Sequence, residues 1–587
     1  MIRTSRKSRS RSSGLANSLN SLSARIVAVL ALIGFSLLGL LGSGAAQAAT
    51  RPNVVLIQTD DQTYSLLRAN YRDDRGRIAP VMPNIRALMI NQGTEFSNYY
   101  SSAPICGPSR ASLLSGQVPH NSRVVTNTGQ FGGWEGWANS HIYTENMAVR
   151  LQEGGYHTAH FGKLTNWYGD AEAGPTGVPP GWDSWGTDVP DDSTRAYYGY
   201  YQYMHIERNN QDEIVGPLGT RNYGLWDGVD PESCSLALLI SSPCNYHSDR
   251  ISWLAADEIA AISDPFYIQV DYHAPHADDV APHGPQPATR HIGLAGRAEL
   301  PGVNAGFRNS NFNERNTADK SFLTQRENGL MKPGNIRNVT NSYRSSVESL
   351  QAVDEGVGLI YRTLRDTGKL DNTYVIFTSD NGYFYGDHRF MWGKGLAYEE
   401  SARMPLVVTG PGVPERRIAR FPGTTVDIAP TVLDITGVGA GNLRLDGVSL
   451  ERGWRAPASK PRRVQLIEYL HPGDMRGEPD RVPEKPYRLR SNRSATKSQP
   501  DKHTSIKVGN YKYIDYDKGG NELYDLVRDP GEMYNQINNP GYRGLQTYLE
   551  RTLQRWRSCA GASCNADPGR IPSARGFTRS VDYLRLR

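Results

Sequence analysis

Cysteine is scarce in this chain, with five residues among 587. Two short disulfides would stabilise little of a chain this long, so a structural protein held together by disulfides is the weakest reading. Beyond residue 50 no apolar run is long enough to span a bilayer, and no internal repeat is present. The net charge of +5 comes from six basic residues near the N-terminus. The rest of the chain is close to neutral, so its charge does not favour nucleic acid as a partner.

The first 48 residues have the pattern of an export leader. A basic stretch precedes the uncharged run 26–41, and Ala46-Gln47-Ala48 is a small-residue cleavage site. The run is shorter than the roughly 20 residues of a spanning helix, which favours a signal peptide over a membrane anchor. Arg6-Lys7 stands where twin-arginine export needs an Arg-Arg pair, so the general secretory route is favoured. We therefore expect a secreted or periplasmic protein without a stable membrane anchor.

Three short apolar segments, 53–59, 266–272 and 373–379, each end at a polar cluster and are typical of buried strands. Helix-like stretches alternate with them, at 82–91, 145–152, 252–262 and 345–366. This alternation predicts an α/β sandwich around a large, mostly parallel sheet. Such sheets carry their sites beyond the carboxyl ends of the strands, so the polar clusters should meet in space.

Oxygen donors dominate two of these clusters, Asp60 with Asp61 and Asp380 with Asn381. Several carboxylates cannot share a cleft without a cation to offset their charge. Hard oxygen ligands fit Ca²⁺ best and Mg²⁺ second. A single Asp-Asp pair is weak support, because such pairs also cap helices and turn loops.

Four cysteines can pair locally, Cys234 with Cys244 and Cys559 with Cys564, which leaves Cys106 unpaired. A lone cysteine is usually a buried structural residue. Here it opens Cys106-Gly-Pro-Ser-Arg110-Ala-Ser-Leu-Leu-Ser-Gly116, and this string resembles the type I sulfatases. In that family the cysteine is oxidised to formylglycine, an aldehyde. The resemblance implies that Cys106 is the nucleophile precursor beside the metal, and that a formylglycine-generating enzyme is a partner during maturation.

Charged residues of the catalytic site follow from the same resemblance. Pro108 suits a first helical position, which would put Cys106 at a positive helix end and Arg110 on the first turn. The segments 154–163 and 392–400 resemble the two lysine segments of the family, and imply that Lys163 and Lys394 contact the sulfate. Preorganised positive charge of this kind stabilises the transition state.

A histidine is needed to protonate the leaving oxygen. His276 in Ala-Pro-His matches the family position for that role, and His273, His283 and His388 are its competitors. The implied mechanism begins with attack on sulfur by one hydroxyl of the hydrated aldehyde. The second hydroxyl then expels sulfate, a step that a serine could not perform.

The most similar branch is that of the N-acetylglucosamine-6-sulfatases. The resemblance includes Pro119-His-Asn, Val178-Pro-Pro-Gly-Trp182 and, near the C-terminus, Glu522-Leu-Tyr-Asp-Leu526. Many sulfatases have a histidine two residues after the first lysine. Lys163-Leu-Thr165-Asn166 lacks it, as this branch does, so Asn166 is implied in substrate binding and the base for the hydrate is unnamed. The aromatic residues Trp167, Tyr168, Trp182 and Trp185 could stack on a sugar or belong to the core.

The resemblance implies an alkaline-phosphatase-superfamily fold, with a catalytic domain at 49–455 and a smaller domain at 456–587. Local patterns agree, since 504–515 and 521–525 favour antiparallel strands and 545–556 is an amphipathic helix. The basic stretch 481–502 is expected to be a loop. The expected function is hydrolysis of a sulfated small molecule or glycan, a 6-O-sulfated N-acetylglucosamine type above others. A general arylsulfatase, a phosphonate or phosphodiester hydrolase and a noncatalytic glycan-binding protein are the alternatives.

Overall fold

A buried sheet organises the fold around strand β1 (Asn53–Thr59). Strands β10 (Phe266–Asp271) and β11 (Thr373–Ser379) flank β1 and run parallel to it. These are the three strands expected from the apolar segments. The structure is a computed structural model. It describes residues 51–73, 75–169, 177–189, 204–208, 220–222, 246–263, 265–277, 284–296, 311–321, 329–475 and 501–579.

Within these residues the large sheet has the strand order β13-β4-β12-β11-β1-β10-β6-β7-β8-β9. The remaining strands are β13 (Arg417–Ala419), β4 (Thr94–Phe96), β12 (Leu406–Thr409), β6 (His157–Gly162), β7 (Ser184–Val189), β8 (Met204–Arg208) and β9 (Thr220–Asn222). The central strands from β11 to β7 are parallel, and antiparallel pairs occur toward both edges. The predicted class, α/β with a mostly parallel mixed sheet, is confirmed.

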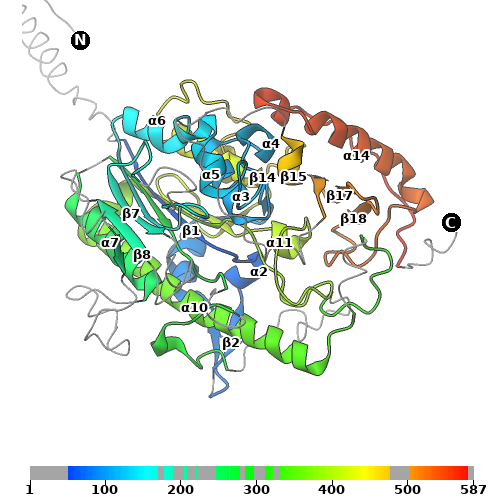
Figure 1. The fold of residues 1–587 in the computed structure, drawn as a ribbon, viewed down its shortest axis with the longest axis horizontal. Coiled ribbons are helices and arrows are strands. Elements are labelled where there is room, and N and C mark those ends of the chain that lie inside the picture. The colour runs from blue at the N-terminus through cyan, green and yellow to red at the C-terminus, as the bar shows by residue number, and fades with distance from the viewer. Residues whose placement is uncertain are drawn as a thin grey trace, which may run out of the picture. The chain divides into compact units, whose positions relative to one another are not determined.

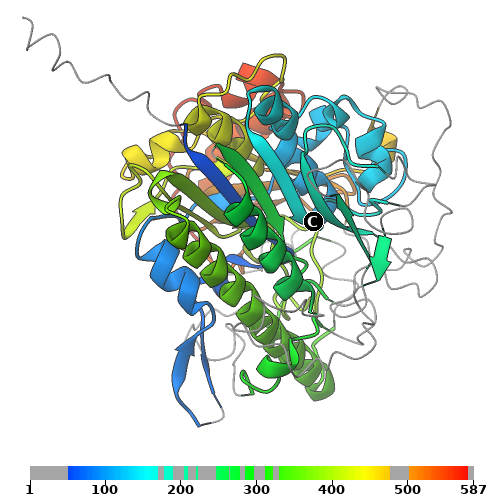
Figure 2. The same cartoon turned by 90° about the vertical axis from the view of Figure 1, so that its left-hand side faces the viewer.

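Helices cover both faces of this sheet, because the side chains of β1 alternate between two cores. Val55 and Ile57 pack with α7 (His247–Ala261), α10 (Pro333–Asp366) and η1 (Ile85–Ile90). Val54 and Leu56 pack on the other face with α3 (Cys106–Ser115), α6 (Met147–Glu153) and α12 (Ile428–Thr436). Figure 2 shows α7 and α10 side by side across the first face.

The predicted helices are present with shifted ends. The stretch 345–366 belongs to α10, which begins earlier, at Pro333, because proline is well suited to the first turn of a helix. The helix predicted at 145–152 is α6, where the Asn146 side chain accepts hydrogen bonds from the first backbone N–H groups. The stretch 82–91 is helical only over Ile85–Ile90, and 252–262 lies within α7.

A second, antiparallel sheet follows in the C-terminal part (Figure 1). Its order is β15 (Val464–Tyr469), β16 (His503–Val508), β17 (Tyr511–Tyr516) and β18 (Glu522–Asp525). Helix α14 (Arg543–Trp556) packs on it through leucines 545, 549 and 553. The expected Cys559–Cys564 disulfide is formed. The predicted boundary near residue 456 falls between α13 (Glu451–Arg455) and β15.

Short elements connect these layers. They are α2 (Tyr64–Leu67), β2 (Asn70–Arg72), β3 (Ile78–Pro80), β5 (Tyr99–Tyr100), α4 (Pro119–Ser122), α5 (Gly133–Ala138), η2 (His141–Tyr143), η5 (Thr289–His291), η6 (Leu370–Asn372), α11 (Glu399–Ala402), β14 (Gly423–Thr424), η7 (Thr425–Asp427), η8 (Pro472–Asp474), η9 (Pro540–Tyr542) and η10 (Gly561–Asn565). No helix in the described part of the chain is long and apolar enough to cross a membrane. The leader, the Cys234–Cys244 pair, His283 and most of the stretch 481–502 lie outside the described residues.

Candidate active site

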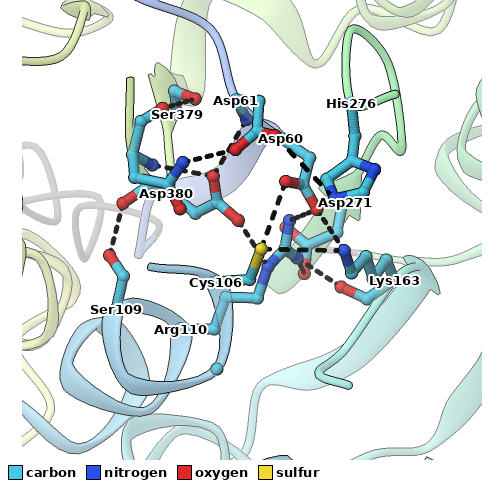
Figure 3. Close-up of polar contacts among 12 residues, drawn as sticks. Asp60, Asp61, Cys106, Ser109, Arg110, Lys163, Asp271, His276, Ser379 and Asp380 are labelled. Atoms are coloured by element: carbon cyan, nitrogen blue, oxygen red, sulfur yellow. Dashed lines mark hydrogen bonds and ion pairs between the residues drawn. The ribbon is translucent and has the colours of Figure 1, made fainter. Parts of the chain in front are cut away.

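Polar side chains meet where three parallel strands end, as Figure 3 shows. Asp60 and Asp61 follow β1, Asp380 and Asn381 follow β11, and Asp271 is the last residue of β10. Cys106 is the first residue of α3, whose N-terminus points into the same cluster. Aligned peptide dipoles make this helix end positive, which favours developing negative charge at Cys106.

The Cys106 thiol is fully buried and surrounded by charge. Its Sγ lies 2.7 Å from Lys394 Nζ, 3.9 Å from Lys163 Nζ and 3.5 Å from Asp60 Oδ1. Burial, together with the Asp60 carboxylate, raises the pKa of the thiol to about 12. A thiol that stays protonated is a poor nucleophile, so cysteine in its native form does not suit this position as the reacting group.

Arg110 lies against three carboxylates of the cluster. Its Nε donates to Asp380 Oδ2 at 2.9 Å, and one terminal nitrogen donates to Asp60 Oδ2 at 3.2 Å. The other terminal nitrogen donates to the Lys163 carbonyl and lies 3.8 Å from Asp271 Oδ2. The side chain is only 2% exposed, and the surrounding carboxylates raise its pKa although burial opposes this. Arg110 is therefore a fixed cation and not the surface salt bridge that a lone arginine would suggest.

Two lysines from different elements reach the cluster. Lys163 follows β6, and its Nζ donates to Asp60 Oδ2. Lys394 Nζ donates to Asp61 Oδ1 and lies 3.6 Å from Asp60 Oδ1. Burial opposes protonation of Lys394, but Asp61 and its neighbours raise its pKa well above the ordinary value. Lys394 therefore carries a positive charge beside Cys106 at neutral pH.

The acidic residues fit a hard divalent cation. Carboxylate oxygens of Asp60, Asp61 and Asp380 lie within 4.8 Å of one another. Asn381 Oδ1 is buried and has no hydrogen-bond donor among the described residues, although the amide nitrogen donates to Asp61 Oδ1. Burial and, after it, the neighbouring Asp60 raise the pKa of Asp380 to about 6. A cation would offset the negative charge of these carboxylates and supply a partner for the orphaned oxygen.

His276 faces this cluster from the loop after β10. Its Nδ1 is 2.7 Å from the carbonyl of Ala277, and Nε2 is 3.8 Å from Asp61 Oδ2. Because a carbonyl oxygen can only accept, Nδ1 carries a proton, and Nε2 is the atom turned toward the cluster. Burial lowers the pKa of His276, while Asp60 and Asp61 oppose that shift. The competitor His273 is buried, with its ring tilted against that of His276 at a centroid distance of 4.9 Å. His388 bonds Glu314 in another cluster.

Asn166 and the four aromatic residues near it lie at different depths in the fold. Among the described residues no hydrogen bond joins the Asn166 side chain to the cluster, and its Oδ1 is buried without a partner. Tyr168, Trp182 and Trp185 are buried in the core beside α3 and α6, so of the two readings for these three aromatics the core reading is correct. Trp167 is partly buried against the same core.

Asp271 and His160 belong to the site but were missed in the sequence. Asp271 Oδ2 accepts from His160 Nε2 at 2.9 Å and from Gln269 Nε2 at 2.7 Å, and all of these side chains are buried. His160 Nδ1 pairs with Thr187 Oγ1 at 2.7 Å. The only available signal was the place of Asp271 at the end of a buried strand. This network fixes the third carboxylate that faces Arg110.

Residues 52–438, about two thirds of the chain, match the sulfatase family. The chain therefore belongs to the sulfatase family. An N-acetylglucosamine-6-sulfatase of Capra hircus is 29% identical over 559 residues, which is 90% of this sulfatase and 89% of the relative. An arylsulfatase of Volvox carteri is 31% identical over 569 residues, covering 93% and 80% of the two chains. A protein solved with its substrate D-glucosamine-2-N,6-O-disulfate shares the fold, with a TM-score of 0.61 and 21% identity over 86% of this chain and 97% of that one.

Proposed function

We propose that this sulfatase hydrolyses sulfate esters with a formylglycine formed from Cys106, and that Asp60, Asp61, Asp380 and Asn381 hold a calcium ion, with magnesium second. The observation that carries the proposal is the setting of Cys106 between two ammonium groups and an oxygen-rich pocket. The cysteine stands in for the oxidised residue, whose hydrate would supply the nucleophile. The cation would supply positive charge at the reacting oxygens.

The chain's own residues provide binding and proton transfer. Lys163 and Lys394 carry ammonium groups beside Cys106, where they would bind the nonbridging oxygens of a sulfate ester. Arg110 keeps Asp60 and Asp380 in place through its fixed donors. His276 Nε2 is turned toward the same space and, when the ring is protonated, would give its proton to the leaving alcohol. Burial lowers the pKa of His276, and Asp60 and Asp61 oppose that shift.

The proposed substrate is a 6-O-sulfated N-acetylglucosamine or a related sugar within a glycan. Support comes from the similarity to an N-acetylglucosamine-6-sulfatase over 90% of the chain. Trp392 adds a physical reason, since it is 37% exposed and precedes Lys394 by only two residues. The loop is anchored, because Phe384 N donates to the Gly393 carbonyl and Gly395 N to Ser401 Oγ. An exposed indole two residues from a lysine of the charged site is suited to stacking on a sugar ring.

A sulfated glycan would meet this enzyme outside the cytoplasm, which agrees with the predicted leader at 1–48 and a secreted or periplasmic location. The formylglycine-generating enzyme would act on Cys106 before the chain folds, because in the folded chain this residue is buried. Gly107 N donates to Asn127 Oδ1, which fixes the first turn of α3 once the fold has formed.

Three measurements on the purified protein test the proposal together. The mass of the peptide containing Cys106 should show an aldehyde, metal analysis should find one divalent cation per chain, and N-acetylglucosamine 6-sulfate should release sulfate. Fully active enzyme with an unmodified thiol, or active enzyme without a bound cation after chelation, would refute the respective part. Asp380→Asn should lose the cation and the activity, whereas Asp387→Asn, outside the cluster, should keep both.

The arylsulfatase alternative has its own support in the 31% identity to the Volvox carteri protein. A panel containing an aryl sulfate, 6-sulfated sugars, and phosphate or phosphonate esters separates the readings. Rapid turnover of the aryl sulfate with no cleavage of any 6-sulfated sugar would assign the general arylsulfatase function. Faster turnover of a phosphonate or phosphodiester would assign that hydrolase class, and binding without any turnover would leave a glycan-binding protein.

Trp392→Ala should raise KM for the sugar substrate about 10-fold and leave KM for the aryl sulfate nearly unchanged.

A further inference from the structure

A cationic cleft lies apart from the catalytic cluster, between the end of β4 and β5 on one side and the smaller sheet on the other. It has a volume of about 520 Å³, and its described lining contains none of the residues of the catalytic cluster. The lining carries five cationic side chains and a single carboxylate. They are Arg403, Arg420, Lys460, Arg462 and Lys507, with Glu399 as the carboxylate. Because the chain without its leader is close to neutral, this is a local concentration of positive charge.

Only part of this charge is compensated within the cleft. Glu399 pairs with Arg403 at 3.5 Å, and it also accepts from Lys512 Nζ at 2.8 Å and from the Tyr100 hydroxyl. In the described part of the chain neither Arg420 nor Lys460 has an ion-pair partner, and both are exposed. Arg462 pairs with Asp567 at 3.0 Å, but both side chains are more than half exposed, so the pair is weak.

Lys507 is the buried member of this cationic set. Its side chain is buried, and Nζ donates only to neutral oxygens, those of Asn98, Gln465 and Gly509. Burial, with help from Lys512 and Arg403, lowers the pKa of Lys507 to about 7, and Glu399 only partly opposes the shift. A bound anion would offset the repulsion of Lys507 by Lys512 and Arg403, because it would place a negative charge beside the buried ammonium group.

The size and lining of the cleft favour an extended anion. Its volume falls in the range of about 300–1,000 Å³ that is typical of ligand sites, far more than one sulfate needs. A neighbouring cavity of about 560 Å³ shares Gly509, Asn510 and Ile571 with it and adds Arg570. The one aromatic residue in the described lining of the cleft, Tyr100, is buried, so the cleft offers no exposed ring for a nucleic-acid base to stack on.

We propose that this cleft is a second binding site, which takes a sulfated saccharide segment at a distance from Cys106. The nature of the ligand rests on the proposed function, since a glycan sulfatase meets chains that carry several sulfates. A long substrate would then be held at two places, by the catalytic cluster and by the cleft, whereas a sulfated monosaccharide would use the catalytic cluster alone.

The test compares two triple variants with the same change in charge. Arg420→Glu, Lys460→Glu and Arg462→Glu reverse the rim of the cleft. Arg75→Glu, Arg337→Glu and Arg365→Glu reverse three exposed arginines elsewhere and serve as the control. Each triple is made in the full chain with Cys106→Ala, so that the ligand is not consumed. A heparin-derived hexasaccharide, the same saccharide without sulfate, and N-acetylglucosamine 6-sulfate are titrated by calorimetry at fixed salt.

The cleft triple should bind the sulfated hexasaccharide at least 10-fold more weakly than the control triple. Binding of the monosaccharide should be equal in both, and so should kcat/KM for the monosaccharide when Cys106 is restored. Equal affinity of the two triples for the sulfated hexasaccharide would overturn the cleft proposal. So would a control triple that binds the unsulfated hexasaccharide as tightly as the sulfated one. Failure of the proposed function looks different, because the enzyme with Cys106 would then release sulfate from no sugar whatever the cleft binds.

Discussion

Lys394 Nζ lies 2.7 Å from Cys106 Sγ, closer than Asp60 Oδ1 at 3.5 Å or Lys163 Nζ at 3.9 Å. The same ammonium donates to Asp61, so it joins the position of the nucleophile to the proposed cation site. A charge held by two partners needs no rearrangement when negative charge develops beside it. Such preorganisation is the main source of electrostatic catalysis.

Lys394→Met should therefore lower kcat about 10²–10³-fold, because one fixed positive group at the reacting centre is lost. Lys394→Arg should recover only part of the rate, since a planar guanidinium cannot occupy the place of a compact ammonium. Steady-state kinetics with a sulfated sugar, together with thermal unfolding, checks this. Full activity of the Met variant would remove Lys394 from catalysis.

His276→Ala should affect substrates according to their leaving groups. A sugar hydroxyl is a poor leaving group and needs a proton, whereas an activated aryl oxide needs little assistance. We expect a loss of about 10²–10⁴-fold for the sugar sulfate and a much smaller loss for the aryl sulfate. His273→Ala is the matched control, because its ring is buried behind His276. Equal losses on both substrates would exclude His276 as the acid.

Asp271→Asn should lower kcat more than it changes KM. Asp271 faces Arg110 at 3.8 Å and is itself fixed by His160 and Gln269, so it acts through Arg110 and not on the substrate. Removing one carboxylate from a buried ionic network should also destabilise the fold, by about 1–3 kcal/mol. Kinetics and chemical denaturation measure the two effects separately. Asp271→Glu should restore part of kcat, and a purely structural role for Asp271 would instead leave kcat unchanged in the folded fraction.

The convergence of Asp60 and Asp380 could be predicted because each follows a buried strand, and parallel strands bring their carboxyl ends together. The place of Cys106 beside them, at the start of α3, was expected from the resemblance to the sulfatases. The four-residue oxygen cluster and the antiparallel second sheet follow from equally local patterns.

The contact between Asp271 and His160 could not be predicted in the same way, because it depends on register. The pairing of β10 with β6 places Gln269 opposite His160 and Asp271 opposite Gly162. A shift of one residue would turn these side chains to the other face, and nothing local to either strand specifies the pairing. The burial of Trp182 and Trp185 likewise depends on long-range packing. The sequence alone therefore could not decide whether these residues belong to the core or stack on a sugar.

The stability of the chain should fall with rising pH because of His120. His120 Nδ1 pairs with Glu468 of β15 at 2.9 Å, and Nε2 lies 2.9 Å from the Cys559 carbonyl, so the residue joins α4 to the smaller sheet. Burial opposes protonation, but Glu468 raises the pKa of His120 to about 9. Below the unfolded pKa of about 6.5, both the folded and the unfolded chain bind the proton, and the pair contributes fully to the free energy of unfolding. Between about 6.5 and 9 only the folded chain keeps the proton, so this contribution is lost as the pH rises. The upper limit of this contribution is roughly 3 kcal/mol.

The difference in unfolding free energy between the native chain and His120→Gln, measured by denaturant titration at several pH values, should shrink over this interval. A difference that stays constant from pH 6 to above 9 would mean that His120 is neutral in the fold and that its contact with Glu468 is an ordinary hydrogen bond.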